Sequence, residues 1–164
     1  MYFIRKATTA DVEIIREIAE KTWWVAYSLI LEKEQINYML GEIYSVEKVT
    51  SQLKNNTQTY LLLIEDDKPV AFAAYSPREE DPEIYKLHKL YCLPETQGKG
   101  YGKILINEVI NKTLDAGKHT LDLNVNRHNK AKTFYEKMGF HMAYEEDIPI
   151  GDYWMNDYVM RKEL

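Results

Sequence analysis

Cysteine is almost absent from this sequence, as are long apolar runs and any excess of basic residues. The one cysteine, Cys92, excludes an internal disulfide and a zinc site built from cysteines, which favours a reducing, cytoplasmic location. No apolar run reaches membrane-spanning length, and Met1–Lys6 lacks the apolar core of a signal peptide, so we expect no membrane association. The net charge of −5, from 21 basic and 26 acidic residues, argues against nucleic-acid binding.

The length of the chain predicts one domain that covers residues 1–164. Thr8 and Asp11 form the pattern of a capping box, which indicates a helix that ends near Tyr27. Apolar periodicity indicates further helices at 32–40, 46–54, 103–116 and 129–138, and strands at 2–7, 59–65, 70–75, 84–93, 121–125, 140–145 and 153–160. Early helices, then strands, then one strand–helix–strand unit predict an α+β fold with a mixed sheet.

The most informative stretch is Gln97-Gly98-Lys99-Gly100-Tyr101-Gly102, which joins the strand at 84–93 to the helix at 103–116. Unpaired N–H groups in the first turn of a helix, its dipole and nearby glycines together bind phosphate groups. Two known phosphate loops are excluded, because both require a glycine where Lys103 stands. Gly102 lies inside the first helical turn, where glycine costs about 1 kcal/mol relative to alanine. We interpret this cost as a need for space beside a phosphate.

Two segments resemble the signatures of one family. Gln97–Gly102 matches the Gln/Arg-x-x-Gly-x-Gly/Ala signature of the Gcn5-related N-acetyltransferases (GNAT superfamily), which holds the pyrophosphate of coenzyme A. Asn129–Phe140 resembles the second signature, Asn-x-x-Ala-x-x-Phe-Tyr-x-x-x-Gly-Phe, except that Asn129 stands two residues before Ala131 and His128 stands three before it. The resemblance covers nearly the whole chain. It implies a GNAT-like, mostly antiparallel mixed sheet flanked by helices, with one β-α-β cofactor unit.

The resemblance also implies an activity, the transfer of acetyl from acetyl-coenzyme A to a primary amine by direct attack in a ternary complex. In the family, the backbone of the strand before the glycine loop holds the pantetheine arm and aims an N–H group at the thioester carbonyl, where negative charge develops. The residues at the matching positions for cofactor binding are Tyr91, Cys92, Leu93, Gln97, Gly98, Lys99, Gly100, Tyr101, Gly102, Lys103 and Asn129. Lys99 and Lys103 would add positive charge beside the phosphates.

Tyr135 would protonate the departing coenzyme A thiolate, since a phenol with a pKa of roughly 10 keeps its proton at neutral pH. Tyr135 also has a structural alternative, because it forms an i, i+3, i+4, i+7 packing stripe with Ala131, Phe134 and Met138. Asn129 is placed equally well to cap a helix. It can serve both roles with different groups.

The acceptor pocket of the family is usually walled by the first helices and their connection. Aromatic faces there can hold a cationic amine, although we expect at least half of these aromatic residues to be core. The candidates are Trp23, Trp24, Tyr27 and Tyr38, with Tyr144, Tyr153 and Trp154 on the closing strands. The pattern Trp23-Trp24-x-x-Tyr27 loosely resembles a bacterial subgroup that includes polyamine acetyltransferases.

A general base is harder to assign from the sequence. Leu87 stands near the place where some relatives carry a catalytic glutamate, so Glu83 and His88 are the remaining candidates. Removal of the proton through water is an equal alternative. Cys92 has no activating partner in the sequence, which predicts a buried thiol rather than a covalent nucleophile.

The sequence leaves three functional interpretations open. We favour a small-molecule amine acceptor; the alternatives are a protein N-terminus or lysine side chain, and a coenzyme A-binding regulatory module without transfer activity. A homodimer is expected only as the commonest state of soluble oligomers.

Overall fold

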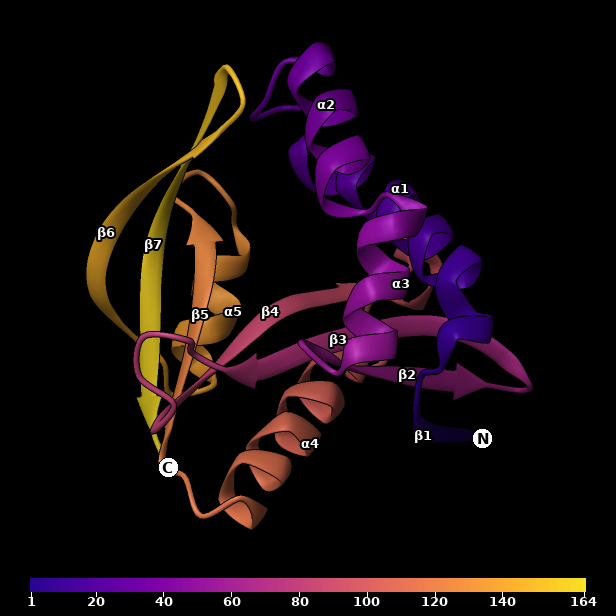
Figure 1. Cartoon of the computed structure of the whole chain (residues 1–164), viewed down its shortest axis with the longest axis vertical. Helices are drawn as coiled ribbons and strands as arrows, with labels where there is room; N and C mark the ends of the chain where they lie inside the picture. Colours follow the sequence, from indigo (N-terminus) through magenta and orange to yellow (C-terminus); the bar gives the residue numbers. More distant parts are fainter.

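The computed structural model describes residues 1–164, and its strands form one seven-stranded sheet in the order β1-β2-β3-β4-β5-β7-β6 (Figure 1). The strands are β1 (Tyr2–Lys6), β2 (Thr59–Glu65), β3 (Lys68–Pro77), β4 (Ile84–Cys92), β5 (Thr120–Asn126), β6 (His141–Ile150) and β7 (Tyr153–Glu163). Neighbouring strands are antiparallel except β4 and β5, which are parallel. The predicted α+β fold with a mixed, mostly antiparallel sheet is confirmed.

Helices cover both faces of the sheet, with the first three on one side and α4 on the other (Figure 1). The helices are α1 (Val12–Tyr27), α2 (Lys33–Ile43), α3 (Val46–Asn55), α4 (Tyr101–Asp115) and α5 (Ala131–Lys137). None of them is long and apolar enough to cross a membrane.

The start of α1 follows from local chemistry. Thr8 and Asp11 form the predicted capping box. The Asp11 carboxylate accepts a hydrogen bond from Thr8 N, and the Thr8 hydroxyl accepts one from Ala10 N. The carboxylate of Asp11 also accepts two hydrogen bonds of 2.8 Å from the Arg5 guanidinium. This bidentate pair joins β1 to the entry of α1.

Three local expectations need correction. The strand expected at 140–145 extends as β6 to Ile150, because β6 is the edge of the sheet and an edge strand tolerates Pro149. The last helix begins at Ala131 rather than Asn129. The apolar periodicity of the first and fourth helices also predicts that Val25 and Leu114 are buried, yet they are 62% and 40% exposed. Val25 lines a cavity that α1 shares with β4.

Candidate active site

β4 and β5 separate in the middle of the sheet. Their parallel pairing runs only from Ile84 opposite Thr120 to Leu87 opposite Leu123, although β4 continues to Cys92. At this point β4 has a bulge: Ala74 of β3 lies opposite Lys89 and Tyr75 lies opposite Leu87, so His88 is the extra residue. A bulge bends a strand and increases its twist. The backbone of β4 after the bulge therefore has no partner on the side that faces β5.

The paired end of the two strands is fixed by a buried charge cluster. Asp122 on β5 is completely buried and accepts hydrogen bonds of 2.7 Å from Arg161 Nε and 2.9 Å from Arg78 Nε. The two arginines come from β7 and from the connection that precedes β4. Three segments are thus joined at the closed end of the gap, and the gap widens toward Cys92 and Asn126.

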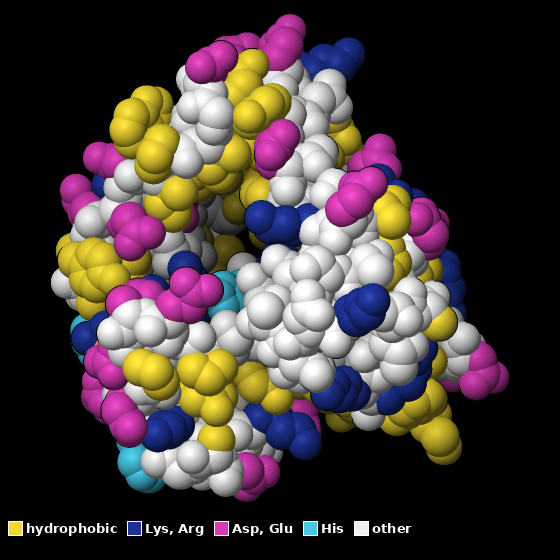
Figure 2. All heavy atoms as spheres, in the orientation of Figure 1, with side chains coloured by type: hydrophobic (Ala, Val, Ile, Leu, Met, Phe, Trp, Pro, Cys, Tyr) yellow, Lys and Arg dark blue, Asp and Glu magenta, His cyan; other side chains and the backbone are white.

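A cavity of about 820 Å³ occupies the widened gap. Figure 2 shows an opening near the centre of this face of the molecule, with hydrophobic side chains on its rim. The wall is built from α1, β4, the glycine loop, β5 and the start of α5. Predicted site residues that line the cavity are Tyr27, His88, Tyr91, Cys92, Gln97, Gly98, Gly100, Asn129 and Tyr135.

The other predicted site residues lie outside the cavity wall. They are Trp23, Trp24, Tyr38, Glu83, Leu93, Lys99, Tyr101, Gly102 and Lys103. Trp23 is only 3% exposed and packs in the core against Tyr27, Tyr44 and Tyr91. Of the seven aromatic candidates only Trp23 and Tyr27 are buried, while Tyr38, Tyr144 and Trp154 are exposed. The expectation that at least half of them are core is therefore wrong.

The glycine loop combines unusual backbone angles with open space. Gly98 and Gly100 have φ angles of 84° and 78°, a region that other residues rarely adopt. A Cβ at either position would meet nothing within 4 Å. Gly100 caps α4, whose first N–H groups have no partner inside the helix and lie beside this open space. The arrangement suits an anion.

Gly102 and Lys99 also contact other parts of the protein. A Cβ on Gly102 would lie 3.4 Å from Phe134 Cζ, which is an ordinary van der Waals contact, so Gly102 lies close to α5. Lys99 Nζ donates to Glu65 Oε2 at 2.7 Å, and the Tyr101 hydroxyl donates to the same oxygen. These contacts hold the pKa of Glu65 below its usual value, the Lys99 bond being the larger cause. Glu65 thereby ties the glycine loop to the end of β2.

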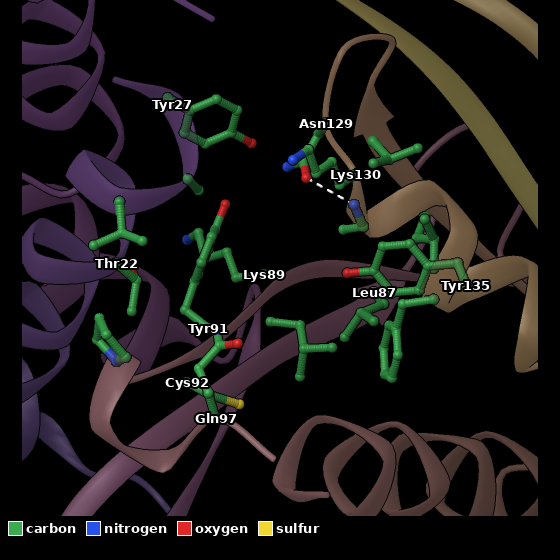
Figure 3. A pocket seen from close by; sticks show the side chains of 18 of the residues that line it. Thr22, Tyr27, Leu87, Lys89, Tyr91, Cys92, Gln97, Asn129, Lys130 and Tyr135 are labelled. Atoms are coloured by element: carbon green, nitrogen blue, oxygen red, sulfur yellow. Dashed lines mark hydrogen bonds between the residues drawn. The ribbon is translucent and has the colours of Figure 1, made fainter. Parts of the chain in front are cut away.

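Tyr27, Tyr91 and Tyr135 approach the cavity from α1, β4 and α5, as Figure 3 shows. Burial raises the pKa of Tyr135, with smaller contributions from Tyr27 and Cys92, so its hydroxyl keeps its proton at neutral pH. Asn129 Oδ1 accepts a hydrogen bond of 2.9 Å from Ala131 N at the first turn of α5 (Figure 3). Lys130 is the N-cap of α5, so Asn129 accepts the N–H of the first helical residue from the position before the cap, and it also lines the cavity.

Of the two base candidates, Glu83 stands just before the first residue of β4 and His88 lies in the middle of that strand. His88 lines the cavity, and its Nε2 lies 2.7 Å from Ser76 Oγ. Burial lowers the pKa of His88 to about 3, with nearby Lys86, Lys89 and Arg78 adding to the shift. Glu83 pairs instead with Lys118 at 2.8 Å on the surface. His88 is therefore neutral at physiological pH, and Glu83 does not reach the cavity.

Cys92 lies at the cavity wall as a protonated thiol. Burial raises its pKa to about 11. A thiol without a base to deprotonate it is a poor nucleophile. The expected burial is only partial, since Cys92 is of intermediate exposure and lines the cavity.

Lys89 is a cavity-lining residue that the sequence analysis did not identify. Its side chain is buried, and Nζ donates to Gln52 Oε1 at 3.0 Å, to Gln58 Oε1 at 3.1 Å and to the Tyr60 hydroxyl. No carboxylate pairs with it, and burial lowers its pKa to about 7. A lysine in a strand with polar neighbours resembles a solvent-facing residue, so the sequence carried no signal for its burial.

Lys89 predicts a specific dependence of stability on pH. In the unfolded chain a lysine keeps its proton up to about 10.5, whereas in the folded protein Lys89 releases it near pH 7. Between these values the unfolded state binds more protons, so the free energy of unfolding should rise from pH 7 to 8.5, by roughly 1 kcal/mol per pH unit. Chemical denaturation at several pH values measures this slope. Lys89→Met should remove this slope, whereas Lys54→Met, at an exposed position, should keep it. Equal slopes in the two variants would contradict the assignment of the slope to Lys89.

Comparison with known proteins agrees with this geometry. Residues 16–140 match the model of the Acetyltransferase (GNAT) family. The chain is similar to the PaiA N-acetyltransferase of Thermoplasma acidophilum, solved in complex with coenzyme A, with a TM-score of 0.85, 28% identity and coverage of 100% of this chain and 99% of that one.

Two curated relatives point to different acceptors. Spermidine N(1)-acetyltransferase from the same organism is 26% identical over 164 residues, 98% of this chain and 96% of that protein. The alanine N-acetyltransferase of ribosomal protein bS18 from Haemophilus influenzae is 35% identical over 91 residues, 54% of this chain and 60% of that protein. The separated β4 and β5, the glycine loop and the family match lead to one conclusion: the chain belongs to the acetyltransferase (GNAT) family and is an N-acetyltransferase.

Proposed function

We propose that this protein transfers acetyl from acetyl-coenzyme A to a primary amine of a small molecule, with polyamines as the favoured class. The observation that carries the proposal is a single cavity lined by the glycine loop and also by Tyr27 and Asn124, with Tyr27 on the side away from Gln97 (Figure 3). A cofactor and an acceptor can therefore meet in one cavity, as direct transfer requires.

The residues present fit coenzyme A. Gly98 and Gly100, with their open space and the start of α4, would hold the pyrophosphate. The unpaired backbone of β4 beyond His88 would hold the pantetheine arm by strand-like hydrogen bonds. Acetyl-coenzyme A would supply an acetyl group already activated as a thioester.

The chain would contribute positioning, charge stabilisation and a proton. The N–H of Leu93 donates to Val70 O on β3 at 2.9 Å, and successive N–H groups of a strand point to opposite sides, so the N–H of Cys92 would stabilise the charge that develops on the acetyl oxygen. The Tyr135 hydroxyl holds its proton at neutral pH and would release it to the leaving sulfur. Cys92 stays protonated and would only fill space beside the reacting atoms.

The far end of the cavity favours a small acceptor over a polypeptide. The β6–β7 hairpin reaches across to the first helices (Figure 1), where Gln35 Nε2 donates to the carbonyl oxygen of Trp154 at 2.8 Å. The rings of Tyr38 and Tyr153 lie 5.4 Å apart, and a Cβ at Gly151 would overlap the Tyr38 hydroxyl. These contacts bridge the side on which an extended peptide would need an open groove.

Similarity to the spermidine N(1)-acetyltransferase over almost the whole chain supports a polyamine acceptor. Similarity to the bS18-alanine enzyme supports a protein N-terminus as the second candidate, but it covers only 54% of the chain. Both acceptors present an amino group that is cationic before it reacts.

Thiol release from acetyl-coenzyme A, followed across polyamines, amino acids, aminoglycosides and short peptides, tests the proposal. We expect release with polyamines at millimolar concentration and little release with peptides. Release with peptides alone would replace the small-molecule acceptor by a protein acceptor. Tight coenzyme A binding without release in any class would favour a regulatory module.

A further inference from the structure

Behind the cavity wall lies a buried carboxylate that the reaction described above does not use. Asp157 on β7 is 5% exposed, and its neighbour Asn124 on β5 lines the cavity. Asn124 Nδ2 donates to Asp157 Oδ2 at 3.1 Å. The other oxygen of each side chain, Asn124 Oδ1 and Asp157 Oδ1, is buried and has no hydrogen-bond partner.

No cation of the chain neutralises Asp157. Arg127 donates to the backbone carbonyl of Asp157 at 3.3 Å, but its guanidinium pairs with the carboxylate of Asp147 at 2.8 Å. Lys86 on β4 is near enough to influence Asp157, yet it forms no ion pair with it. A buried carboxylate without a cationic partner is costly, and buried hydrogen-bond acceptors in native proteins nearly always have a donor.

We propose that Asn124 and Asp157 bind a positively charged amino group of the acceptor through their two unpartnered oxygens. The inference rests on the proposed function, since it names the part of the same cavity that recognises the amine. An ammonium group carries a positive charge and three N–H donors. It can therefore donate to both unpartnered oxygens and neutralise the negative charge of Asp157. A neutral hydroxyl or thiol acceptor carries no charge and offers only one donor.

The surrounding charges define how this pair responds to pH. Burial raises the pKa of Asp157 to about 6, which Glu146 on β6 also favours, while Asn124, Lys86 and Arg127 oppose it. His88 remains neutral because its pKa is about 3, and burial keeps the Tyr27 phenol protonated by raising its pKa. Asp157 is therefore charged at pH 7.5 and neutral at pH 5, and amine affinity should fall between these values.

Calorimetric titration of spermidine into the protein saturated with coenzyme A measures this binding without turnover. At pH 7.5 we expect Asp157→Asn to raise the Kd of spermidine at least tenfold relative to the wild type. The amide has nearly the same shape and removes only an unpaired charge, so the thermal midpoint should not fall. Glu163→Gln removes the same charge from an exposed site on the same strand and should bind spermidine like the wild type.

The dependence on pH adds a readout that a structural role would not change. Spermidine affinity of the wild type should weaken from pH 7.5 to pH 5, and that of Asp157→Asn should stay nearly constant. Equal spermidine affinity in wild type and Asp157→Asn, or no binding to the wild type, would overturn the inference.

Different results would contradict the proposed acetyl transfer and the proposed ammonium site. Binding that depends on Asp157 without thiol release for any acceptor would overturn the proposed transfer and leave the ammonium site standing. Transfer to an amine with the same KM in wild type and Asp157→Asn would overturn the ammonium site and leave the transfer standing.

Discussion

Tyr135→Phe is expected to lower kcat by about 10² to 10⁴-fold while leaving the Kd of coenzyme A nearly unchanged. The Tyr135 ring packs at the edge of the core beside Phe134 and Phe140, and these contacts survive in phenylalanine. Only the hydroxyl on the cavity side is lost (Figure 3). Steady-state thiol release and calorimetric binding of coenzyme A together separate the two effects.

A matched variant shows whether the effect belongs to this position. Tyr85→Phe removes a hydroxyl from the start of β4, where the ring stacks on Tyr75 away from the cavity, and should keep the wild-type kcat. If Tyr135→Phe also keeps the wild-type kcat, the proton for the leaving thiolate comes from elsewhere and Tyr135 is a packing residue.

Gly100→Ala is expected to weaken coenzyme A binding about 10- to 100-fold. The φ angle of 78° at Gly100 is strained for alanine, by roughly 1–2 kcal/mol. The new methyl group would also enter the open space beside the N-terminus of α4, where the loss of hydrogen bonds to a charged group costs about 1.5–3 kcal/mol each. Calorimetric titration with coenzyme A measures the loss of affinity.

Gly117 provides the control for backbone strain. It follows α4 at the other end, has a φ angle of 77°, and a Cβ there would also meet nothing within 4 Å. Gly117→Ala and Gly100→Ala should therefore lower the thermal midpoint to a similar extent, but Gly117→Ala should bind coenzyme A like the wild type. Equal coenzyme A affinity in both variants would mean that the glycine loop does not hold the cofactor.

The sequence predicted well what depends on local chemistry. The strand at 59–65 and the capping box of Thr8 and Asp11 are as expected, because a short apolar run and a cap depend on a few neighbouring residues. The glycine loop before a helix was recognisable for the same reason. The family resemblance and the mixed, mostly antiparallel sheet are confirmed.

Features that depend on contacts between distant strands were not predictable. The bulge at His88 and the separation of β4 from β5 arise from the register with β3 and β5, which no local pattern encodes. Trp23 and Tyr27 lie on one face of α1, but only Tyr27, in the last turn, extends beyond the core into the cavity. Asp157 resembled a polar residue on the solvent side of a strand, although the sheet buries it.

The measurement that tests the central claim most directly is a product analysis with acetyl-coenzyme A and spermidine. Free thiol and acetylated amine are quantified in the same reaction, the second by mass spectrometry. Direct transfer in the cavity between β4 and β5 predicts one acetylated amine for each thiol released, with both lost in Tyr135→Phe. Thiol without acetylated spermidine would show that water is the acceptor, and the absence of both would contradict spermidine acetylation.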